Sequence, residues 1–214
     1  MTARLGVVRP ATPRTTMLKT SGLISPQEAA AIERSLERVI AAFPGQKLTI
    51  AEIGLWDGTT SRGIRDWFAE KGVAIDHHCF DSGKESPAAP YPECTYHLGD
   101  SLVTVLAFGE PVHWALVDGC HCADHACADT LGLGGRLVIG GEMAVHDTSI
   151  HLPPTRDYQG HGPHDARHHI TGVRYGLNAI GMLPPVARAG FALAEEVEYP
   201  KYDGRTGVII YRRT

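Results

Sequence analysis

Two glycines and two acidic residues share one short segment, Ala51-Glu52-Ile53-Gly54-Leu55-Trp56-Asp57-Gly58, which follows an apolar run. Gly54 and Gly58 allow a tight turn and a close approach of the backbone to a ligand. Their G-x-x-x-G spacing differs from the G-x-G-x-x-G of dinucleotide sites, and there is no G-K-S/T motif to cradle a phosphate. The carboxylates of Glu52 and Asp57 disfavour a phosphate and favour a cation such as an ammonium or a sulfonium. The segment therefore predicts a site for a positively charged small molecule.

Acidic residues also follow the next two strand-like runs. Asp81 comes directly after Val73 to Phe80, and Asp100 and Ser101 come shortly after Thr95 to Leu98. A carboxylate at the carboxyl end of a strand can accept hydrogen bonds from both hydroxyls of a ribose. A side chain in the Asp100-Ser101 turn can meet the amino group of an adenine. These positions predict a nucleoside beside the cationic group.

The elements that must position these residues alternate between strand-like and helix-like segments. The predicted strands are Leu48 to Ile53, Val73 to Phe80, Thr95 to Leu98, Val112 to Val117 and Arg136 to Ile139, and the predicted helices are Thr59 to Lys71 and Cys122 to Leu131. Two further runs, Phe191 to Tyr199 and Val208 to Arg212, are separated by a length that suits a hairpin. The pattern predicts an α/β, Rossmann-like fold. Its seven-stranded, mostly parallel sheet ends in an antiparallel hairpin and carries helices on both faces.

A further helix precedes the sheet. Ser25 can cap it, Pro26 suits its first position, and Glu28 stands where a capping box places its acid. An apolar stripe continues to about Ala42, and Pro44-Gly45 ends the helix. The stripe indicates that one face of the helix packs against another part of the protein or a partner. The helix could therefore be a lid or a homodimer surface.

We expect residues 1–45 to form an amino-terminal arm and cap helix. Residues 46–214 are predicted to form one domain with a His-rich insert at about residues 149–169. Residues 1 to about 20 show no periodicity and predict a poorly ordered arm or an oligomer contact. The insert carries histidines at positions 151, 161, 164, 168 and 169 and is either a lid over the site or a polar surface loop.

In their order along the chain, these motifs resemble those of class I S-adenosylmethionine-dependent methyltransferases. The resemblance covers about Leu48 to Thr148 and, through the last strand pair, the topology to the end of the chain. It implies that S-adenosylmethionine is bound by Glu52, Gly54, Gly58, Asp81, Asp100, Ser101 and Asp118. The glycines would line the methionine part, Asp81 would hold the ribose, and the Asp100-Ser101 turn would flank the adenine. Trp56 would either pack on the cofactor or belong to the core.

A second pattern resembles a narrower branch of that family. Asp118-Gly119-Cys120-His121, Gly134-Gly135 and His146-Asp147-Thr148 look like the macrocin-type O-methyltransferases and the cephalosporin-hydroxylase-like proteins. In several relatives, acids at these two strand ends bind a divalent metal, which implies Asp118 and Asp147 as ligands. Alternatively, Asp118 touches only the methionine end of the cofactor.

The chemistry of these residues fits such a role. A hard dication such as Mg²⁺ can hold a vicinal hydroxyl pair and lower the hydroxyl pKa. His121 is a candidate general base, because imidazole titrates near neutral pH. Thr148 stands where a third acid or an amide is common in relatives. His146 could replace that ligand and would suit a softer metal.

Three cysteines with two histidines form another candidate metal site. Cys120, Cys122 and Cys127 lie close to His121 and His125, but the C-x-C-x₄-C spacing lacks the second, distant pair of a structural zinc site. Small buried cysteines packed against the sheet are the preferred interpretation.

Composition narrows the function classes. The 214-residue chain is 43% hydrophobic and carries a net charge of −4, so we expect no nucleic-acid partner and no membrane span. We expect a cytoplasmic protein, and the resemblance to methyltransferases implies an enzyme that methylates a hydroxyl of a small molecule. The alternatives are a nicotinamide-dependent oxidoreductase, which the glycine spacing argues against, and a non-catalytic metal-binding or scaffold protein.

Overall fold

A computed structural model describes residues 18–20, 24–83, 93–148, 173–182, 190–198 and 207–214. The elements along the chain are α1 (Pro26–Ala42), β1 (Leu48–Ile53), α2 (Thr59–Glu70), β2 (Ile75–Asp81), β3 (Cys94–Leu98), α3 (Ser101–Ala107), β4 (Val112–Val117), α4 (Ala123–Gly134), β5 (Leu137–His146), α5 (Val173–Ala179), β6 (Phe191–Val197) and β7 (Val208–Arg213).

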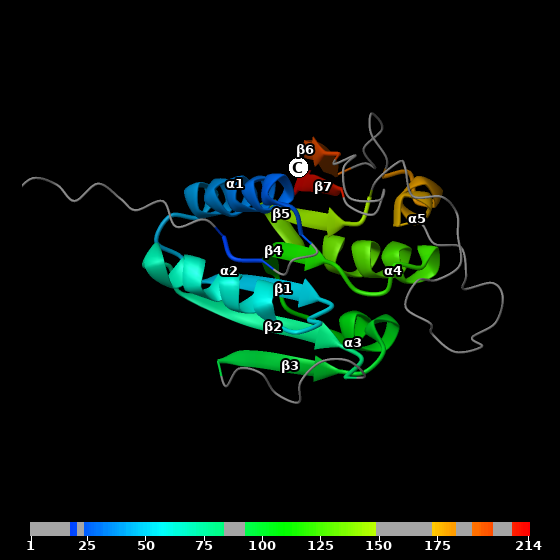
Figure 1. Ribbon diagram of the computed structural model, residues 1–214, viewed down its shortest axis with the longest axis horizontal. Coiled ribbons are helices and arrows are strands. Elements are labelled where there is room, and N and C mark those ends of the chain that lie inside the picture. The colour runs from blue at the N-terminus through cyan, green and yellow to red at the C-terminus, as the bar shows by residue number, and fades with distance from the viewer. Residues whose placement is uncertain (1–17, 21–23, 84–92, 149–172, 183–189, 199–206) are drawn as a thin grey trace, which may run out of the picture.

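The strands form one sheet in the order β3-β2-β1-β4-β5-β7-β6 (Figure 1). Strands β1 to β5 pair in parallel, and β7 pairs antiparallel with both β5 and β6. The order reverses at β1, since β2 and β3 lie on one side of it and β4 and β5 on the other. In doubly wound sheets, ligands bind at the carboxyl ends of the strands that flank such a reversal.

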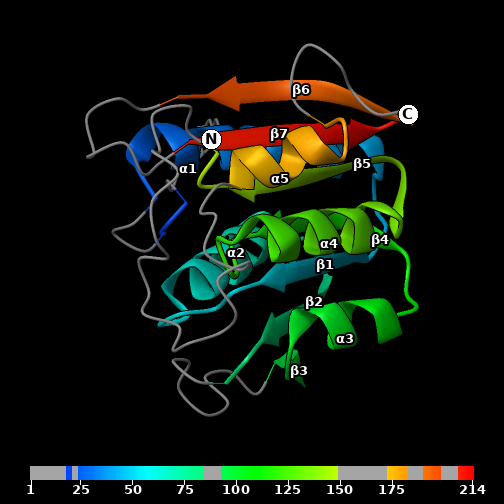
Figure 2. The same ribbon diagram turned by 90° about the vertical axis from the view of Figure 1, so that its right-hand side faces the viewer.

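Helices cover both faces of the sheet (Figure 2), with α1 and α2 on one face and α3, α4 and α5 on the other. Side chains alternate across β1, so Ile50 packs on the α1/α2 side and Ala51 on the opposite side. Trp67 and Trp114 are the largest buried side chains of the α1/α2 side. Each buried apolar side chain of this size contributes about 1.5–3 kcal/mol to folding.

Helix α1 begins with the predicted capping box. The Ser25 hydroxyl accepts the N–H of Glu28 at 3.3 Å, and Oε2 of Glu28 accepts the N–H of Ser25 at 2.7 Å. Ile32, Leu36 and Val39 are fully buried, so the apolar stripe of the helix packs on the sheet.

A buried carboxylate fastens α1 to the sheet. Glu142 of β5 accepts the Ser35 hydroxyl at 2.7 Å and two bonds of 2.9 Å from Nε and Nη2 of Arg38. Nη2 of Arg212 on β7 reaches the same carboxylate at 2.9 Å. One side chain therefore joins α1, β5 and β7.

The predicted fold class is confirmed, and α1, β1 and β4 have the predicted bounds. The prediction for β5 was wrong in length, because the strand continues past Ile139 to His146. Gly140, with φ of 87°, and Gly141 looked like a strand end. They lie where the register with β4 shifts between Leu137 and Glu142, and beyond them the strand pairs with both β4 and β7.

Three other features were not predicted. Helices α3 and α5 have only 7 residues each, too few to show a helical period. Leu18 is 4% exposed and belongs to the core on the α1/α2 side, so it is not part of the predicted poorly ordered arm. Residues 1–17 and the predicted His-rich insert lie outside the described residues.

None of the helices in the described ranges is both long and apolar enough to cross a bilayer.

Candidate functional site

The carboxyl ends of β1 and β4 meet at the point where the strand order reverses. Ile53 pairs with Val117, and the N–H of Asp118 donates to the carbonyl oxygen of Ile53 at 2.9 Å. Gly54 has a φ of 86°, and a Cβ at this position would lie 2.0 Å from the carbonyl oxygen of Asp118. Glycine is therefore required here, and its absent side chain lets the loop after β1 pass directly beside Asp118.

The loop from Gly54 to Gly58 holds a strained aromatic residue. Trp56 has a φ of 49° and is 49% exposed, so it does not belong to the core. A non-glycine residue in this region costs about 1–3 kcal/mol, and such strain clusters at functional sites. Asp57 accepts the N–H of Thr59 at 2.9 Å at the start of α2. The loop thus presents an exposed indole beside the sheet edge.

Asp81 connects this loop to the end of β2. Its Oδ2 accepts the N–H of Leu55 at 2.9 Å, and its Oδ1 accepts the N–H of Gly83 at 2.7 Å. Each carboxylate oxygen has two lone pairs, so the bonds among the described residues leave one acceptor position on each oxygen. The carboxylate is fixed by the backbone and still able to accept a pair of hydroxyls.

Asp100 and Ser101 begin α3 beside α4. Oδ1 of Asp100 caps α3 by accepting the N–H of Leu102 at 2.9 Å, and it lies 3.3 Å from Nε2 of His125. Ser101 contacts Asp129 of α4, and burial raises the pKa of Asp129 to about 6. The predicted adenine-binding turn therefore faces a group of ionisable side chains on α4.

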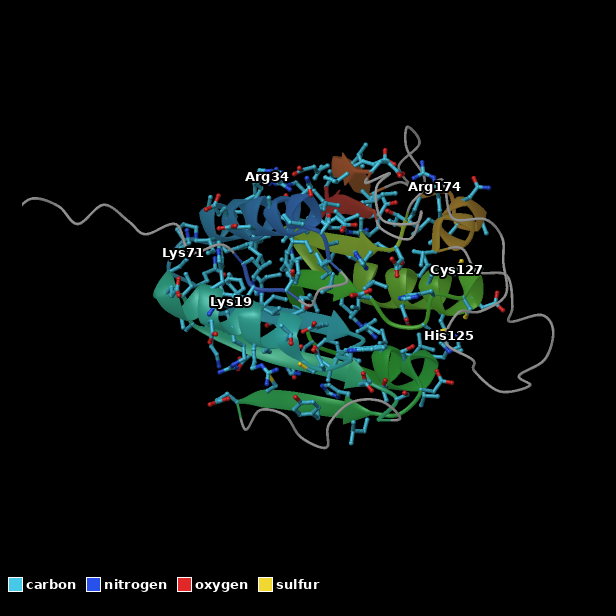
Figure 3. All side chains as sticks on the ribbon, viewed as in Figure 1. Lys19, Arg34, Lys71, His125, Cys127 and Arg174 are labelled. Atoms are coloured by element: carbon cyan, nitrogen blue, oxygen red, sulfur yellow. The ribbon has the colours of Figure 1, made fainter. Side chains whose placement is uncertain are left out.

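The three cysteines near the amino end of α4 do not all belong to one group. Sγ of Cys122 lies 3.0 Å from Nδ1 of His125, and Cys120 joins them in a group whose donor atoms lie within 4.8 Å of one another. Cys127 instead donates to the carbonyl oxygen of Gly176 at 2.9 Å. His125 and Cys127 both lie at the side of the molecule to which the arrowheads of β1 and β2 point (Figure 3). The structure thus brings two of the three cysteines together with one histidine.

Five ionisable side chains form what we call the acid–imidazole cluster: Glu28, Asp118, His121, His146 and Asp147. Nδ1 of His146 lies 2.9 Å from Oδ1 of Asp118 and 3.6 Å from Oδ1 of Asp147. Its Nε2 lies 3.5 Å from Oε1 of Glu28. Nε2 of His121 lies 2.9 Å from Asp147 and 3.7 Å from Asp118. Two imidazoles are thus held among three carboxylates.

Attraction to the neighbouring carboxylates keeps the two imidazoles of this cluster charged. Burial opposes the charge of His146, but Asp118 and Asp147 outweigh it and hold the pKa of His146 well above its usual value. Burial likewise opposes the charge of His121, yet the same carboxylates raise its pKa to about 10. Burial would raise the pKa of Asp118, and the charge of His146 together with the His121 contact lowers it instead. Both imidazoles therefore carry protons at neutral pH.

The donor set of the cluster fits a divalent metal. Asp118, His146 and Asp147 offer two carboxylate oxygens and one imidazole nitrogen within 4.8 Å of one another. Asp147 has a φ of 56°, a strained conformation directly after β5. Carboxylates suit Mg²⁺ and Mn²⁺, and an added imidazole also suits Zn²⁺. The imidazole of His146, rather than the hydroxyl of Thr148, completes this set.

The structure brings most of the predicted site residues to one sheet edge, with one exception and one addition. Glu52 is 1% exposed and lies beneath α2, where its Oε2 is 3.3 Å from Nε2 of His77. Its side chain therefore lies apart from the other predicted residues. Glu28 joins the site from α1 and was predicted only as a capping residue. The capping role of Glu28 could be predicted because it depends on neighbouring residues. Its contact with His146 could not, because the two residues are 118 positions apart in the sequence.

No family model and no curated protein sequence matches the chain. Solved structures do match it. The CMeT domain of the citrinin polyketide synthase is 18% identical with a TM-score of 0.57, over 88% of this chain and 53% of that chain. The N-methyltransferase NodS from Bradyrhizobium japonicum WM9 is 13% identical with a TM-score of 0.53, over 88% and 97%.

A third structure is the MycE methyltransferase of the mycinamycin biosynthetic pathway, in complex with Mg, SAH and mycinamycin VI. It is 16% identical with a TM-score of 0.52, over 83% of this chain and 47% of that chain. The chain thus spans about half the length of the CMeT and MycE chains. At these identities the likeness concerns the fold. The chain has the fold of class I S-adenosylmethionine-dependent methyltransferases.

Proposed function

We propose that this chain is an S-adenosylmethionine-dependent methyltransferase that methylates a hydroxyl group of a small molecule. The observation that carries the proposal is the position of the acid–imidazole cluster. Asp118 of this cluster directly follows β4 and lies beside the Gly54 loop, at the reversal of the strand order. Doubly wound sheets in general bind their ligands at this edge, which supports the proposal.

The cofactor part of the proposal is supported by charge and hydrogen bonding. Asp57, Asp81 and Asp118 give the edge acidic groups, which favour a cationic sulfonium and an ammonium. Asp81 keeps acceptor positions for a hydroxyl pair, and Asp100 and Ser101 would flank the adenine. S-adenosylmethionine, when bound, supplies a methyl group already activated on sulfur.

The chain's own contribution is then orientation and proton transfer. His121 points its Nε2 at Asp147 and is one third exposed, so it can meet a substrate hydroxyl. It holds a proton as long as the negative potential of Asp118 and Asp147 is uncompensated. Once that potential is compensated, the pKa of His121 falls and its Nε2 can accept the hydroxyl proton.

A divalent metal would be held by Asp118, Asp147 and His146. It would supply Lewis acidity and would orient neighbouring hydroxyls. The donor set supports this part of the proposal, as does the presence of Mg in the MycE complex. Activity that EDTA leaves unchanged and added Mg²⁺ or Mn²⁺ does not raise would contradict it.

Calorimetry with S-adenosylhomocysteine tests the proposal directly. We expect the purified chain to bind this product and to show no binding of NAD, which is the ligand of the oxidoreductase alternative. Asp81→Asn should weaken the binding at least about 10-fold, because it removes a charged acceptor worth about 1.5–3 kcal/mol. The control is Asp76→Asn on the same strand, whose side chain is 51% exposed and pairs with Lys47.

Two results would contradict the proposal. The first is the absence of heat on titration with either S-adenosylmethionine or S-adenosylhomocysteine. The second is an affinity for S-adenosylhomocysteine that Asp81→Asn and Asp76→Asn leave equally unchanged, which would remove Asp81 from the site.

A further inference from the structure

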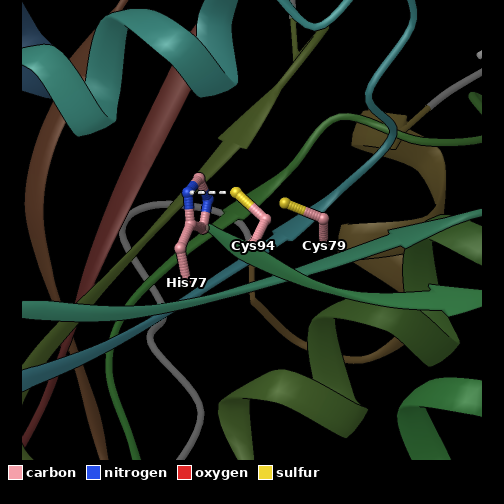
Figure 4. A group of neighbouring side chains, drawn as sticks. All are labelled: His77, Cys79 and Cys94. Carbon is pink, nitrogen blue, oxygen red and sulfur yellow. Dashed lines mark hydrogen bonds between the residues drawn. The ribbon is translucent and has the colours of Figure 1, made fainter. Parts of the chain in front are cut away.

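A second group of donor side chains lies beneath α2, apart from the acid–imidazole cluster. His77 and Cys79 lie two residues apart on β2, and Cys94 begins β3. His77 pairs with Cys94 in the parallel register, so all three side chains share one face of the sheet. Figure 4 shows the imidazole and the two sulfur atoms turned toward one another.

The spacing of these atoms matches a tetrahedral metal site. Nδ1 of His77 lies 3.5 Å from Sγ of Cys94, and the donor atoms of all three residues lie within 4.8 Å of one another. A tetrahedral Zn²⁺ with nitrogen at about 2.05 Å and sulfur at about 2.3 Å separates these two ligand atoms by about 3.6 Å. The observed His77–Cys94 distance therefore needs little adjustment to admit the ion.

Glu52 provides an independent observation. Its Oε2 lies 3.3 Å from Nε2 of His77, and the two side chains are 1% and 0% exposed. Within the described residues, neither of these two atoms has an aligned hydrogen-bond partner. Histidines that bind metals usually direct their second nitrogen to a carboxylate, which orients the ring. This arrangement leaves Nδ1 of His77 for the ion.

Helix α2 closes the group and balances its charge. Nη1 of Arg65 lies 4.0 Å from Sγ of Cys94 and donates to the carbonyl oxygen of Glu93 at 2.8 Å. Two thiolates and Glu52 would carry three negative charges, which a dication and Arg65 would neutralise. Buried charges require such compensation. Cys94 is only partly buried, which leaves an approach from the sheet edge.

We propose that His77, Cys79 and Cys94 bind a thiophilic divalent cation of the Zn²⁺ class, with Glu52 orienting the imidazole. Thiolate and imidazole donors select such ions over Mg²⁺. Three protein ligands leave one position of a tetrahedral ion for water. The ion would clamp the edge strand β3 to β2, so the site is independent of the proposed methyl transfer.

The test uses reduced, chelator-treated protein carrying Cys120→Ser and Cys122→Ser, which removes the other cysteine group. Titration with Co²⁺ should give one equivalent of binding with thiolate-to-metal charge-transfer absorption, and Zn²⁺ should displace it. Binding at Asp118, His146 and Asp147 gives no such absorption, because that set holds no sulfur. A titration without charge-transfer absorption would overturn the proposal.

Further variants in this background identify the ligands. Cys94→Ser should weaken Zn²⁺ binding more than about 100-fold, and Glu52→Gln about 10–100-fold, as is usual for an outer carboxylate. Cys127→Ser is the matched control, since Cys127 lies on α4, on the face of the sheet opposite α2, and its thiol donates to the carbonyl oxygen of Gly176. Equal affinities in the Cys94→Ser and Cys127→Ser variants would refute the site.

The site can also be tested on the unaltered chain, so that the result does not require any variant to fold. Zn²⁺ should protect the partly buried Cys94 from alkylation, as read by mass spectrometry of the peptides, and should leave the labelling of Cys127 unchanged. Equal labelling of Cys94 with and without Zn²⁺ would count against the proposal.

Discussion

The proton on His121 follows from the two carboxylates that face it. Asp147 and Asp118 lie 2.9 and 3.7 Å from its Nε2, and they outweigh the burial that opposes its charge. The pKa of His121 rises from 6.5 to about 10. The predicted general base is therefore an acid in the ligand-free chain at neutral pH.

This shift predicts a pH-dependent stability. Because the folded chain binds the proton more tightly than the unfolded chain, the contribution of His121 is complete below pH 6.5 and is lost as the pH rises toward 10. The side chain is one third exposed, so we expect screening to limit this contribution to about 1–2 kcal/mol.

Urea unfolding of the unaltered chain and of His121→Gln in EDTA measures this contribution. The difference in unfolding free energy should be largest below pH 6.5 and should shrink as the pH rises toward 10. A difference that stays constant over this range would show that His121 is not held protonated by Asp118 and Asp147.

At the scale of the elements, the contact between β1 and β4 depends on Gly54. Its φ of 86° and the missing Cβ allow the carbonyl oxygen of Asp118 to approach the backbone of the loop. Gly45 also has a positive φ, of 72°, but a Cβ there would meet nothing within 4 Å. Alanine substitutions at these two glycines therefore differ: one at Gly45 tests the cost of the backbone conformation alone, and one at Gly54 adds the cost of a steric clash.

Gly54→Ala should therefore destabilise the chain by about 3 kcal/mol or more, since alanine pays the left-handed penalty of about 1–2 kcal/mol and also forces β1 away from β4. Gly45→Ala should cost only the penalty itself. Urea unfolding of both variants measures the two losses. Equal losses would mean that the strands separate easily and that the close approach is not required.

At the scale of the whole molecule, α1 is both a layer of the core and a part of the site. Its amino end supplies Glu28 to His146, and its middle is held by the contacts of Ser35 and Arg38 with Glu142. The same helix thus connects the stability of the fold to the charge balance of the acid–imidazole cluster.

Glu142→Ala should reduce the unfolding free energy by about 2–4 kcal/mol, because it removes a buried acceptor and leaves the guanidinium of Arg38 without its main partner. Glu195 also pairs with Arg38, but its side chain is 21% exposed. Glu195→Ala should therefore reduce the unfolding free energy by less than about 1 kcal/mol. Denaturant unfolding followed by circular dichroism compares the two. A smaller loss for Glu142→Ala than for Glu195→Ala would contradict the role assigned to the buried carboxylate.

Much of the fold could be predicted because its signals are local. The capping box at Ser25, the apolar runs of β1 and β4, and the terminal hairpin all depend on residues close together in the sequence. The extension of β5 past Gly140 could not be predicted, because it is stabilised by β4 and β7, which pair with the segment from Glu142 onward on its two sides. The seven-residue helices α3 and α5 are too short for periodicity to reveal them.

The sequence by itself determined the α/β class and the acids at the strand ends, because strand periodicity and turn residues are properties of short segments. Only the tertiary structure decided which charges face one another. Glu52 lies against His77 beneath α2, and Glu28 crosses from α1 to His146. Such pairings depend on how helices and strands distant in the sequence pack. The protonation of His121 and the gathering of His77, Cys79 and Cys94 follow from that packing alone.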